Sequence, residues 1–164
     1  MCQKIYIIGP VGSGKTTLAK NMAYKWNIKN YELDKIVWND EKGNVKRSPE
    51  EIDSLFLEIL KKPSWIIEDV GRQRFIEGIK QADIVYYIDL PPIIIYKRLI
   101  TRCVKQKLGL EPYNYKPTLR GLIEFFGWAK KDIKTKNKKI AEIKKYAKQF
   151  EILSYSSWNN WKDS

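Results

Sequence analysis

The chain has no histidine and only two cysteines among its 164 residues, Cys2 and Cys103. The absence of histidine excludes a histidine general base, a catalytic triad built on histidine and a zinc site with histidine ligands. Two cysteines supply neither a disulfide framework nor a structural zinc site, and this favours a reducing compartment. No apolar run approaches the ~18 residues that a membrane span needs. We therefore expect a cytoplasmic protein that does not cross a membrane.

Acidic residues are scarce in the second half of the chain. The formal net charge is +12, and residues 97–148 carry 16 basic but only 4 acidic side chains, whereas residues 1–60 carry 9 and 8. A basic C-terminal half favours polyanionic ligands such as nucleotides, phosphorylated substrates or nucleic acid. The alternative is a lysine-rich surface that only interacts with solvent. The length and the 43% hydrophobic content predict one globular domain over residues 1–164.

A glycine-rich motif lies close to the N-terminus. Residues 9–16 fit G-x-x-x-x-G-K-[ST], the phosphate-binding P-loop, between an expected strand over residues 4–8 and an expected helix over residues 17–26. Glycines let the backbone wrap around a polyphosphate, and the helix N-terminus attracts anions. Lys15 should reach the β- and γ-phosphates, and the Thr16 hydroxyl should ligate Mg²⁺. The predicted nucleotide-binding residues are Gly9, Gly12, Ser13, Gly14, Lys15, Thr16 and Thr17. The alternative is a strand-to-helix turn with an incidental lysine.

A second strand is expected over residues 29–34 and ends at Asp34. Ligands of parallel α/β sheets bind at the carboxyl ends of the strands, so Asp34 is placed to hold an acceptor hydroxyl or a metal-bound water. The alternative is that Asp34 caps the N-terminus of a short helix over residues 35–38. Residues 39–48 are polar and predict a loop.

A third strand is expected over residues 64–69, and it ends in Glu68 and Asp69. Glu68 follows an apolar run and can orient Mg²⁺-bound water at the strand end. Arg72 and Arg74 follow within a few residues, and arginine side chains bind phosphate through two parallel hydrogen bonds. The alternative is a set of ion pairs on the surface.

The rest of the chain continues the alternation of strands and helices. We expect a strand over residues 81–90, a helix from Ile93 to about Lys107, another helix after Pro117 and a last strand over residues 149–154. This order predicts an α/β protein of the three-layer P-loop NTPase type. Its parallel five-stranded sheet would have the strand order 2-3-1-4-5, with helices on both faces and a small helical lid.

Several segments resemble the nucleoside monophosphate kinases, adenylate kinase above all. Residues 66–72 match the strand-end acid and the phosphate-binding arginine of that group, and Arg98 and Arg102 match its R-x-x-x-R pair. The resemblance implies that Arg98 lies against the adenine of ATP and that Arg102 touches the transferring phosphate. It also implies an acceptor-binding region over residues 34–62 and a lid-like region over residues 103–128. Arg120 is the candidate lid arginine.

Two departures from that group concern the acceptor. Asp69 stands where adenylate kinases have a glycine, and no arginine follows Asp34 closely. These differences argue against a pocket for AMP. An acid together with Trp38 suits a hydroxyl-bearing acceptor such as a nucleoside or a small polyol.

A closer resemblance is to the small proteins named DNA topology modulation proteins, the FlaR-related group. It rests on residues 31–38, 65–68, 107–110 and 115–118. The name of that group records a phenotype, so the resemblance adds no reaction.

The motifs together predict an ATP- and Mg²⁺-dependent phosphotransferase. It would move the γ-phosphoryl group of ATP to a nucleoside, a nucleotide or another small hydroxyl metabolite. The expected catalytic residues are Lys15, Asp34, Arg72, Arg102 and Arg120, and the expected Mg²⁺ residues are Thr16 and, through water, Glu68. The alternative is a P-loop ATPase or nucleotide-switched protein that binds DNA or RNA through its basic C-terminal half. The sequence leaves open the acceptor, the choice between monomer and dimer, and the role of Trp158 and Trp161.

Overall fold

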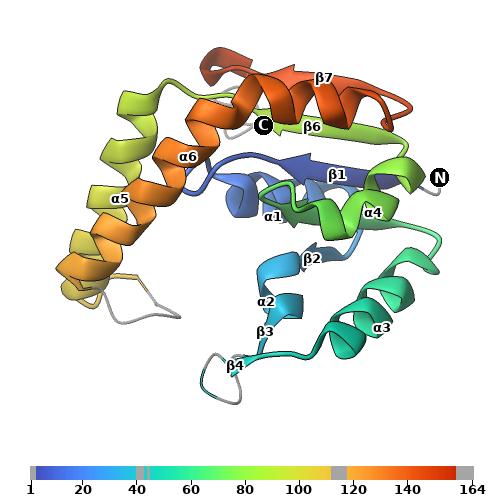
Figure 1. Ribbon diagram of the computed structural model, residues 1–164, viewed down its shortest axis with the longest axis horizontal. Helices are drawn as coiled ribbons and strands as arrows, with labels where there is room; N and C mark the ends of the chain where they lie inside the picture. Colours follow the sequence, from blue (N-terminus) through green and yellow to red (C-terminus); the bar gives the residue numbers. More distant parts are fainter. Residues whose placement is uncertain (1–2, 40–42, 44, 112–117, 158–164) are drawn as a thin grey trace.

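The structure is a computed structural model that describes residues 3–39, 43, 45–111 and 118–157. A parallel five-stranded sheet forms its centre (Figure 1). Its strands are β1 (Lys4–Ile8), β2 (Asn30–Glu32), β5 (Trp65–Asp69), β6 (Ile84–Ile88) and β7 (Phe150–Leu153), and they lie in the order β2-β5-β1-β6-β7. Numbered among these five strands alone, this is the predicted order 2-3-1-4-5. The three-layer α/β fold predicted from the sequence is therefore confirmed.

Alternating side chains of the strands fill two cores, one on each face of the sheet. Ile5 and Ile7 of β1 pack on one face against α1 (Lys15–Trp26), α5 (Pro92–Lys107) and the middle of α6 (Leu119–Lys144). Tyr6 and Ile8 point to the other face, as the two-residue period of a strand requires. The strand β1 is almost completely buried because it lies at the centre of the sheet between both cores.

Three helices and a turn cover the second face within the described residues. They are α2 (Leu33–Val37), α3 (Pro49–Leu60), the 3-10 turn η2 (Gln73–Phe75) and α4 (Ile76–Gln81). A capping box of Ser48 and Glu51 starts α3, with Pro49 at its first position. The strands β3 (Trp38–Asn39) and β4 (Val45–Lys46) pair antiparallel, so part of the segment expected to be a loop is a hairpin.

The helix α6 is a single helix of 26 residues, and it contributes to both cores. Ala129 packs with α1 and α5, whereas Ile143 packs with α3 and α4 on the other face. The ribbon runs diagonally across the molecule between these two places (Figure 1). The polar residues in the middle of α6 consequently pass the carboxyl ends of the central strands.

The predicted lid-like region overlaps these long helices. Residues 103–107 belong to α5 and residues 119–128 belong to α6. Residues 112–117 lie outside the described residues, as do Trp158 and Trp161, so the lid and the role of the tail stay predictions. Among the described residues, no helix is both long enough and apolar enough to span a membrane.

Candidate active site

The glycine motif forms a tight loop between β1 and α1. Gly12 and Gly14 have φ angles of 78° and 91°, in the left-handed region that glycine adopts without steric cost. A Cβ atom at Gly9 would lie 2.8 Å from the Ser13 hydroxyl, so a larger residue does not fit there. The helix α1 begins at Lys15 without a side-chain cap, and a helix start of this kind attracts anions.

The polar side chains of the loop point to a phosphate ligand. The Lys15 ammonium group donates a hydrogen bond of 3.0 Å to the Pro10 carbonyl, and therefore lies across the loop. Burial lowers the pKa of Lys15, and the negative charge of Glu68 acts in the opposite direction. The Ser13 hydroxyl is buried and has no hydrogen-bond partner among the described residues. A buried hydroxyl without a partner fits a loop that closes around a ligand with oxygen atoms.

Thr16 and Glu68 meet beside this loop. The Thr16 hydroxyl donates a hydrogen bond of 2.5 Å to Glu68 Oε1, although the two residues are 52 positions apart. Glu68 is 5% exposed, its other oxygen has no partner among the described residues, and burial raises the pKa of its carboxyl group. A hydroxyl and a carboxylate oxygen are ligands that Mg²⁺ accepts, and Mg²⁺ keeps several waters in such sites. The residues present therefore fit the expected metal.

Arg72 joins two carboxylates on the other side of the site. Its guanidinium group donates to Asp69 and to Asp34. The carboxylate of Asp69 is fully buried and also accepts from the backbone N–H groups of Gly71, at 2.8 Å, and Arg72, at 2.6 Å. Burial acts to lower the pKa of Arg72, but the two carboxylates outweigh it and raise the pKa.

Asp34 lies in the first turn of α2 and not at the end of a strand. The N-cap of that helix is Glu32, so the alternative that Asp34 is the cap is wrong. Because Asp34 pairs with Arg72 and its charge also acts on Lys15, it lies between the P-loop and the loop that follows β5.

The three other predicted arginines occupy different surroundings. Arg98 donates a hydrogen bond of 2.8 Å to the Ser13 carbonyl, so it lies against the P-loop. Arg102 lies over the ring of Phe125 on α6, 5.1 Å from its centroid, and burial lowers its pKa. The side chain of Arg120 is 91% exposed and pairs with Glu124 at 3.3 Å. The structure thus places Lys15, Thr16, Glu68, Asp34, Arg72 and Arg98 around the loop. The functional roles of all these residues, and of Arg102 and Arg120, stay predictions.

Three polar residues of α6 reach the site, and sequence reasoning did not single them out. Lys139 donates to the Val70 carbonyl at 2.8 Å and to Asp132 at 2.9 Å, and Lys136 binds Asp89 at 3.0 Å. Their spacing of i, i+4 and i+7 places them on one side of the helix. This spacing is the feature of the sequence from which they could have been predicted to lie together. Part of the positive charge of α6 therefore faces the sheet and is neutralised there.

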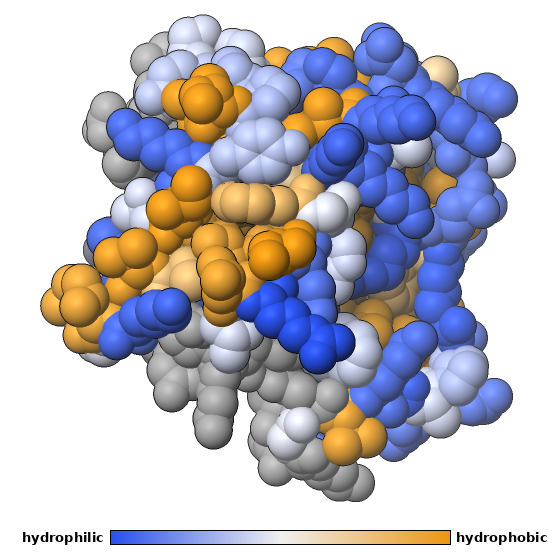
Figure 2. All heavy atoms as spheres, turned by 60° about the vertical axis from the view of Figure 1, so that its left-hand side comes forward, coloured by the Kyte–Doolittle hydropathy of each residue, from blue (hydrophilic) through white to orange (hydrophobic). Residues whose placement is uncertain are grey.

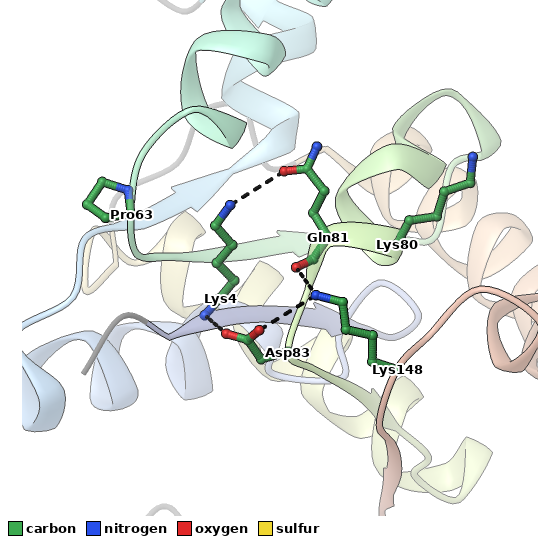
Figure 3. A pocket seen from close by; sticks show the side chains of 6 residues that line it. All are labelled: Lys4, Pro63, Lys80, Gln81, Asp83 and Lys148. Atoms are coloured by element: carbon green, nitrogen blue, oxygen red, sulfur yellow. Dashed lines mark hydrogen bonds and ion pairs between the residues drawn. The ribbon is translucent and has the colours of Figure 1, made fainter.

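A cavity of about 350 Å³ lies at the opposite edge of the sheet (Figure 3). Lys4 and Lys148 line it, and their ammonium groups donate to the Leu60 carbonyl at 3.2 Å and the Gln81 carbonyl at 3.1 Å. Those carbonyls end α3 and α4, where lysine side chains commonly bind. The cavity lies away from the P-loop, and these contacts give its lysines a structural role.

Comparisons with known proteins support the fold. No family model matches the chain, and no curated protein matches it. A shikimate kinase from Bacteroides thetaiotaomicron superposes with a TM-score of 0.60 at 15% identity, over 98% of this chain and 94% of that one. A shikimate kinase from Acinetobacter baumannii in complex with shikimate gives 0.59 at 17% identity, over 97% and 86%. A sugar kinase from Janibacter sp. HTCC2649 gives 0.52 at 14% identity, over 99% and 91%.

These likenesses show the fold and nothing more, because the sequence identities are low. The chain is an α/β protein with the three-layer fold that these P-loop kinases share. That fold agrees with the resemblance to nucleoside monophosphate kinases. The resemblance to the DNA topology modulation proteins stays a prediction.

Proposed function

We infer that the protein is an ATP- and Mg²⁺-dependent phosphotransferase. It would move the γ-phosphoryl group of ATP to a hydroxyl group of a nucleoside, a nucleotide or another small metabolite. The observation that carries this inference is the hydrogen bond between Thr16 and Glu68 beside the Lys15 ammonium group. It joins the start of α1 to the end of β5, where a metal and a polyphosphate are bound in enzymes that transfer phosphoryl groups. The kinase neighbours, including a shikimate kinase and a sugar kinase, support the same class of reaction.

Different residues of the chain have different roles in the proposed reaction. The P-loop backbone and Lys15 bind the β- and γ-phosphates, and Arg98 supports the loop from α5. Thr16 and Glu68 would hold Mg²⁺ and its waters, and the metal would supply positive charge to neutralise the transferring group. The acceptor oxygen forms a bond to the γ-phosphorus while the bond from this phosphorus to the bridging oxygen of ADP breaks. Asp34 takes the hydroxyl proton, and Arg72 stabilises the charge of the transferring group.

The release of ADP from ATP and Mg²⁺ tests this proposal. A panel of nucleosides, nucleoside monophosphates, sugars and polyols is added one compound at a time. We expect one class of acceptor to accelerate ADP release strongly, and Lys15→Ala to lower that rate by about 10²–10³ or more. Lys20 lies exposed on the same helix, so Lys20→Ala is the matched control and should keep the wild-type rate. Slow ADP release that no acceptor changes would contradict the proposal.

A second candidate function is supported by the outer side of α6. Four lysines there, and Lys145 at the C-cap, are exposed and form no ion pair among the described residues; the four on the helix are Lys130, Lys131, Lys134 and Lys138. Such a row can bind the phosphates of DNA or RNA. Fluorescence anisotropy with a labelled 20-base-pair DNA and a single-stranded RNA, repeated over a salt series, tests it. Affinity that falls steeply with salt and is competed by ATP would favour this candidate.

A further inference from the structure

The acceptor region of the described chain differs in charge from the rest of the molecule. We define it as residues 33–39, 45–53 and 69–74, which comprise α2, the β3–β4 hairpin with the start of α3, and the loop after β5. It carries five basic and five acidic residues, whereas the whole chain has a net charge of +12. The region therefore offers no overall attraction to an anionic acceptor, although the protein as a whole is strongly basic.

Arg72 is the cation that contacts Asp34, the proposed base, and its charge is more than balanced. Its guanidinium group donates to both Asp34 and Asp69, so these three side chains together carry a net charge of −1. Asp69 is fixed in this arrangement because it is buried and also accepts from the N–H groups of Gly71 and Arg72. The Asp34 side chain is 67% exposed, whereas that of Asp69 is fully buried, so Asp69 stays beside Arg72 whatever Asp34 does. An anionic acceptor would have to displace Asp34 from Arg72 or lie beside both carboxylates, and their negative charge would repel it.

The other cations of the acceptor region also have partners. Arg74 binds Asp53 at 2.8 Å and the Pro49 carbonyl at 2.6 Å. Lys35 binds Glu32 at 3.0 Å. Arg47 donates to three backbone carbonyls at the end of α2, at distances from 2.6 to 3.1 Å: those of Lys35, Ile36 and Trp38. Lys46 on β4 is the exception among the described residues of this region, and it is exposed at the hairpin.

The lysines that α6 brings to the same edge of the sheet do not change this balance. Lys139 binds Asp132 and the Val70 carbonyl, and Lys136 binds Asp89. Each lysine is thus matched by one carboxylate. The positive charge of these two lysines is therefore neutralised by carboxylates of the protein itself and does not attract an anionic acceptor.

We propose that the acceptor is an uncharged polyhydroxyl compound, such as a sugar, a cyclic polyol or a nucleoside, and not a carboxylate or a phosphate ester. This deepens the proposed phosphotransferase function and rests on it. A hydroxyl group can donate to Asp34 and accept from Arg72 without breaking the contact between them. Its bond to phosphorus forms as the proton passes to Asp34 and ADP leaves, so the step requires no further cation for the acceptor.

Matched pairs of acceptors that differ mainly in charge test the proposal. The pairs are glucose with glucuronate, methyl shikimate with shikimate, and adenosine with adenosine monophosphate, all at the same ionic strength. We expect kcat/KM for the neutral member of the active pair to exceed that of the anionic member at least tenfold. The pair that is active separates the sugar, the cyclic polyol and the nucleoside. A preference for the anionic member would overturn the proposal and leave the phosphotransferase function intact, whereas the lack of any active acceptor would contradict that function itself.

Variants test whether the carboxylates set this preference. Asp69→Asn keeps the side-chain shape and removes one of the two charges on Arg72, and we expect it to shift the ratio of anionic to neutral kcat/KM about tenfold toward the anion. Asp53→Asn removes the charge from an exposed pair, so it should fold normally and shift the ratio in the same direction by less. Glu77→Gln breaks a similar pair with Lys80 on α4, outside the acceptor region, and should leave the ratio unchanged. An unchanged ratio in both aspartate variants would refute the role of these charges.

Discussion

The hydroxyl of Thr16 donates to Oε1 of Glu68 and thereby joins the first turn of α1 to the carboxyl end of β5. The second oxygen of Glu68 is buried and has no partner among the described residues. A buried carboxylate with half of its hydrogen-bonding capacity unused lowers the stability of a fold, and proteins keep such groups where they bind a ligand. A substitution of Glu68 therefore tests whether the residue that would bind the metal also lowers the free energy of unfolding.

Glu68→Gln should stabilise the protein while it abolishes turnover. Burial raises the pKa of Glu68 above its usual value of 4.5, so the folded chain binds this proton more tightly than the unfolded chain. The cost of the ionised side chain is absent below the unfolded pKa and grows as the pH rises through the folded pKa. The melting temperature of the variant should exceed that of wild type at pH 7, by roughly 2–4 °C for each 1 kcal/mol gained, and the difference should vanish at acidic pH. A variant less stable than wild type at pH 7 would contradict this account.

The pH dependence of turnover follows from the same shift. The carboxylate form of Glu68 holds the metal and accepts from Thr16, so activity should fall as the pH decreases and Glu68 is protonated. Because its pKa is raised, the acidic limb should lie above the usual glutamate pKa of 4.5. Bound Mg²⁺ would lower the pKa of a carboxylate that holds it, so the limb is measured as kcat/KM for Mg²⁺ between pH 4 and 8, which reports the metal-free enzyme. If activity instead falls only at or below pH 4.5, the loss of activity is caused by protonation of a group other than Glu68, and the prediction is wrong.

Two glycines should respond in opposite directions to substitution by alanine. Gly12 has a φ angle of 78°, and a Cβ atom there would lie 3.0 Å from the side chain of Leu99, so Gly12→Ala should cost about 1–3 kcal/mol. Gly127 lies inside α6 with no atom within 4 Å of a Cβ position, so Gly127→Ala should stabilise the helix by about 0.5–1 kcal/mol. Urea unfolding of both variants gives the comparison. A similar loss of stability in both would mean that the conformation of the P-loop is not the cause.

The fold could be predicted from the sequence because its signals are local. The apolar run of residues 4–8 before the glycine motif, and the capping box of Ser48 and Glu51, each determine an element by themselves. The antiparallel pairing of β3 and β4 could not be predicted in this way, since each of these strands has only two residues. Such short strands have no periodicity that distinguishes them from a loop.

The candidate site could be predicted only in part. The P-loop motif identifies Lys15 and Thr16 directly, and the strand pattern identifies Glu68. The contact between Arg72 and Asp34 depends on how α2 packs beside β5, and a charge pattern along the chain does not reveal such packing. The basic C-terminal half was predicted to favour polyanionic ligands, but Lys139 faces the sheet whereas Lys138 is exposed. Neighbouring residues of a helix point in different directions, so a count of charges cannot separate them.

Exposed apolar side chains form a surface over α5 and α6, and this surface predicts self-association in solution. Figure 2 shows hydrophobic side chains gathered on one face, and exposed residues of both helices include Ile100, Val104 and Ile123. Exposed apolar patches of this kind favour association between proteins. We expect light scattering to show a mass that rises with protein concentration, and Val104→Lys to reduce that rise. A constant monomer mass for wild type would contradict this prediction.

Lys139 and Lys138 provide the last prediction, because they are adjacent in sequence and differ in their contacts. The Lys139 ammonium group donates to the Val70 carbonyl, and its side chain packs against Gly71, just before Arg72. Lys139→Met should keep most of this packing but remove both this hydrogen bond and the ion pair with Asp132, at a cost of about 1–3 kcal/mol in stability. The loop that carries Arg72 should then be held less firmly, so kcat should fall roughly tenfold with little change in the KM for ATP. Lys138→Met, on the exposed side of α6, should change stability by no more than about 0.5 kcal/mol and leave kcat unchanged. Equal kinetics in the two variants would show that α6 does not position the loop after β5.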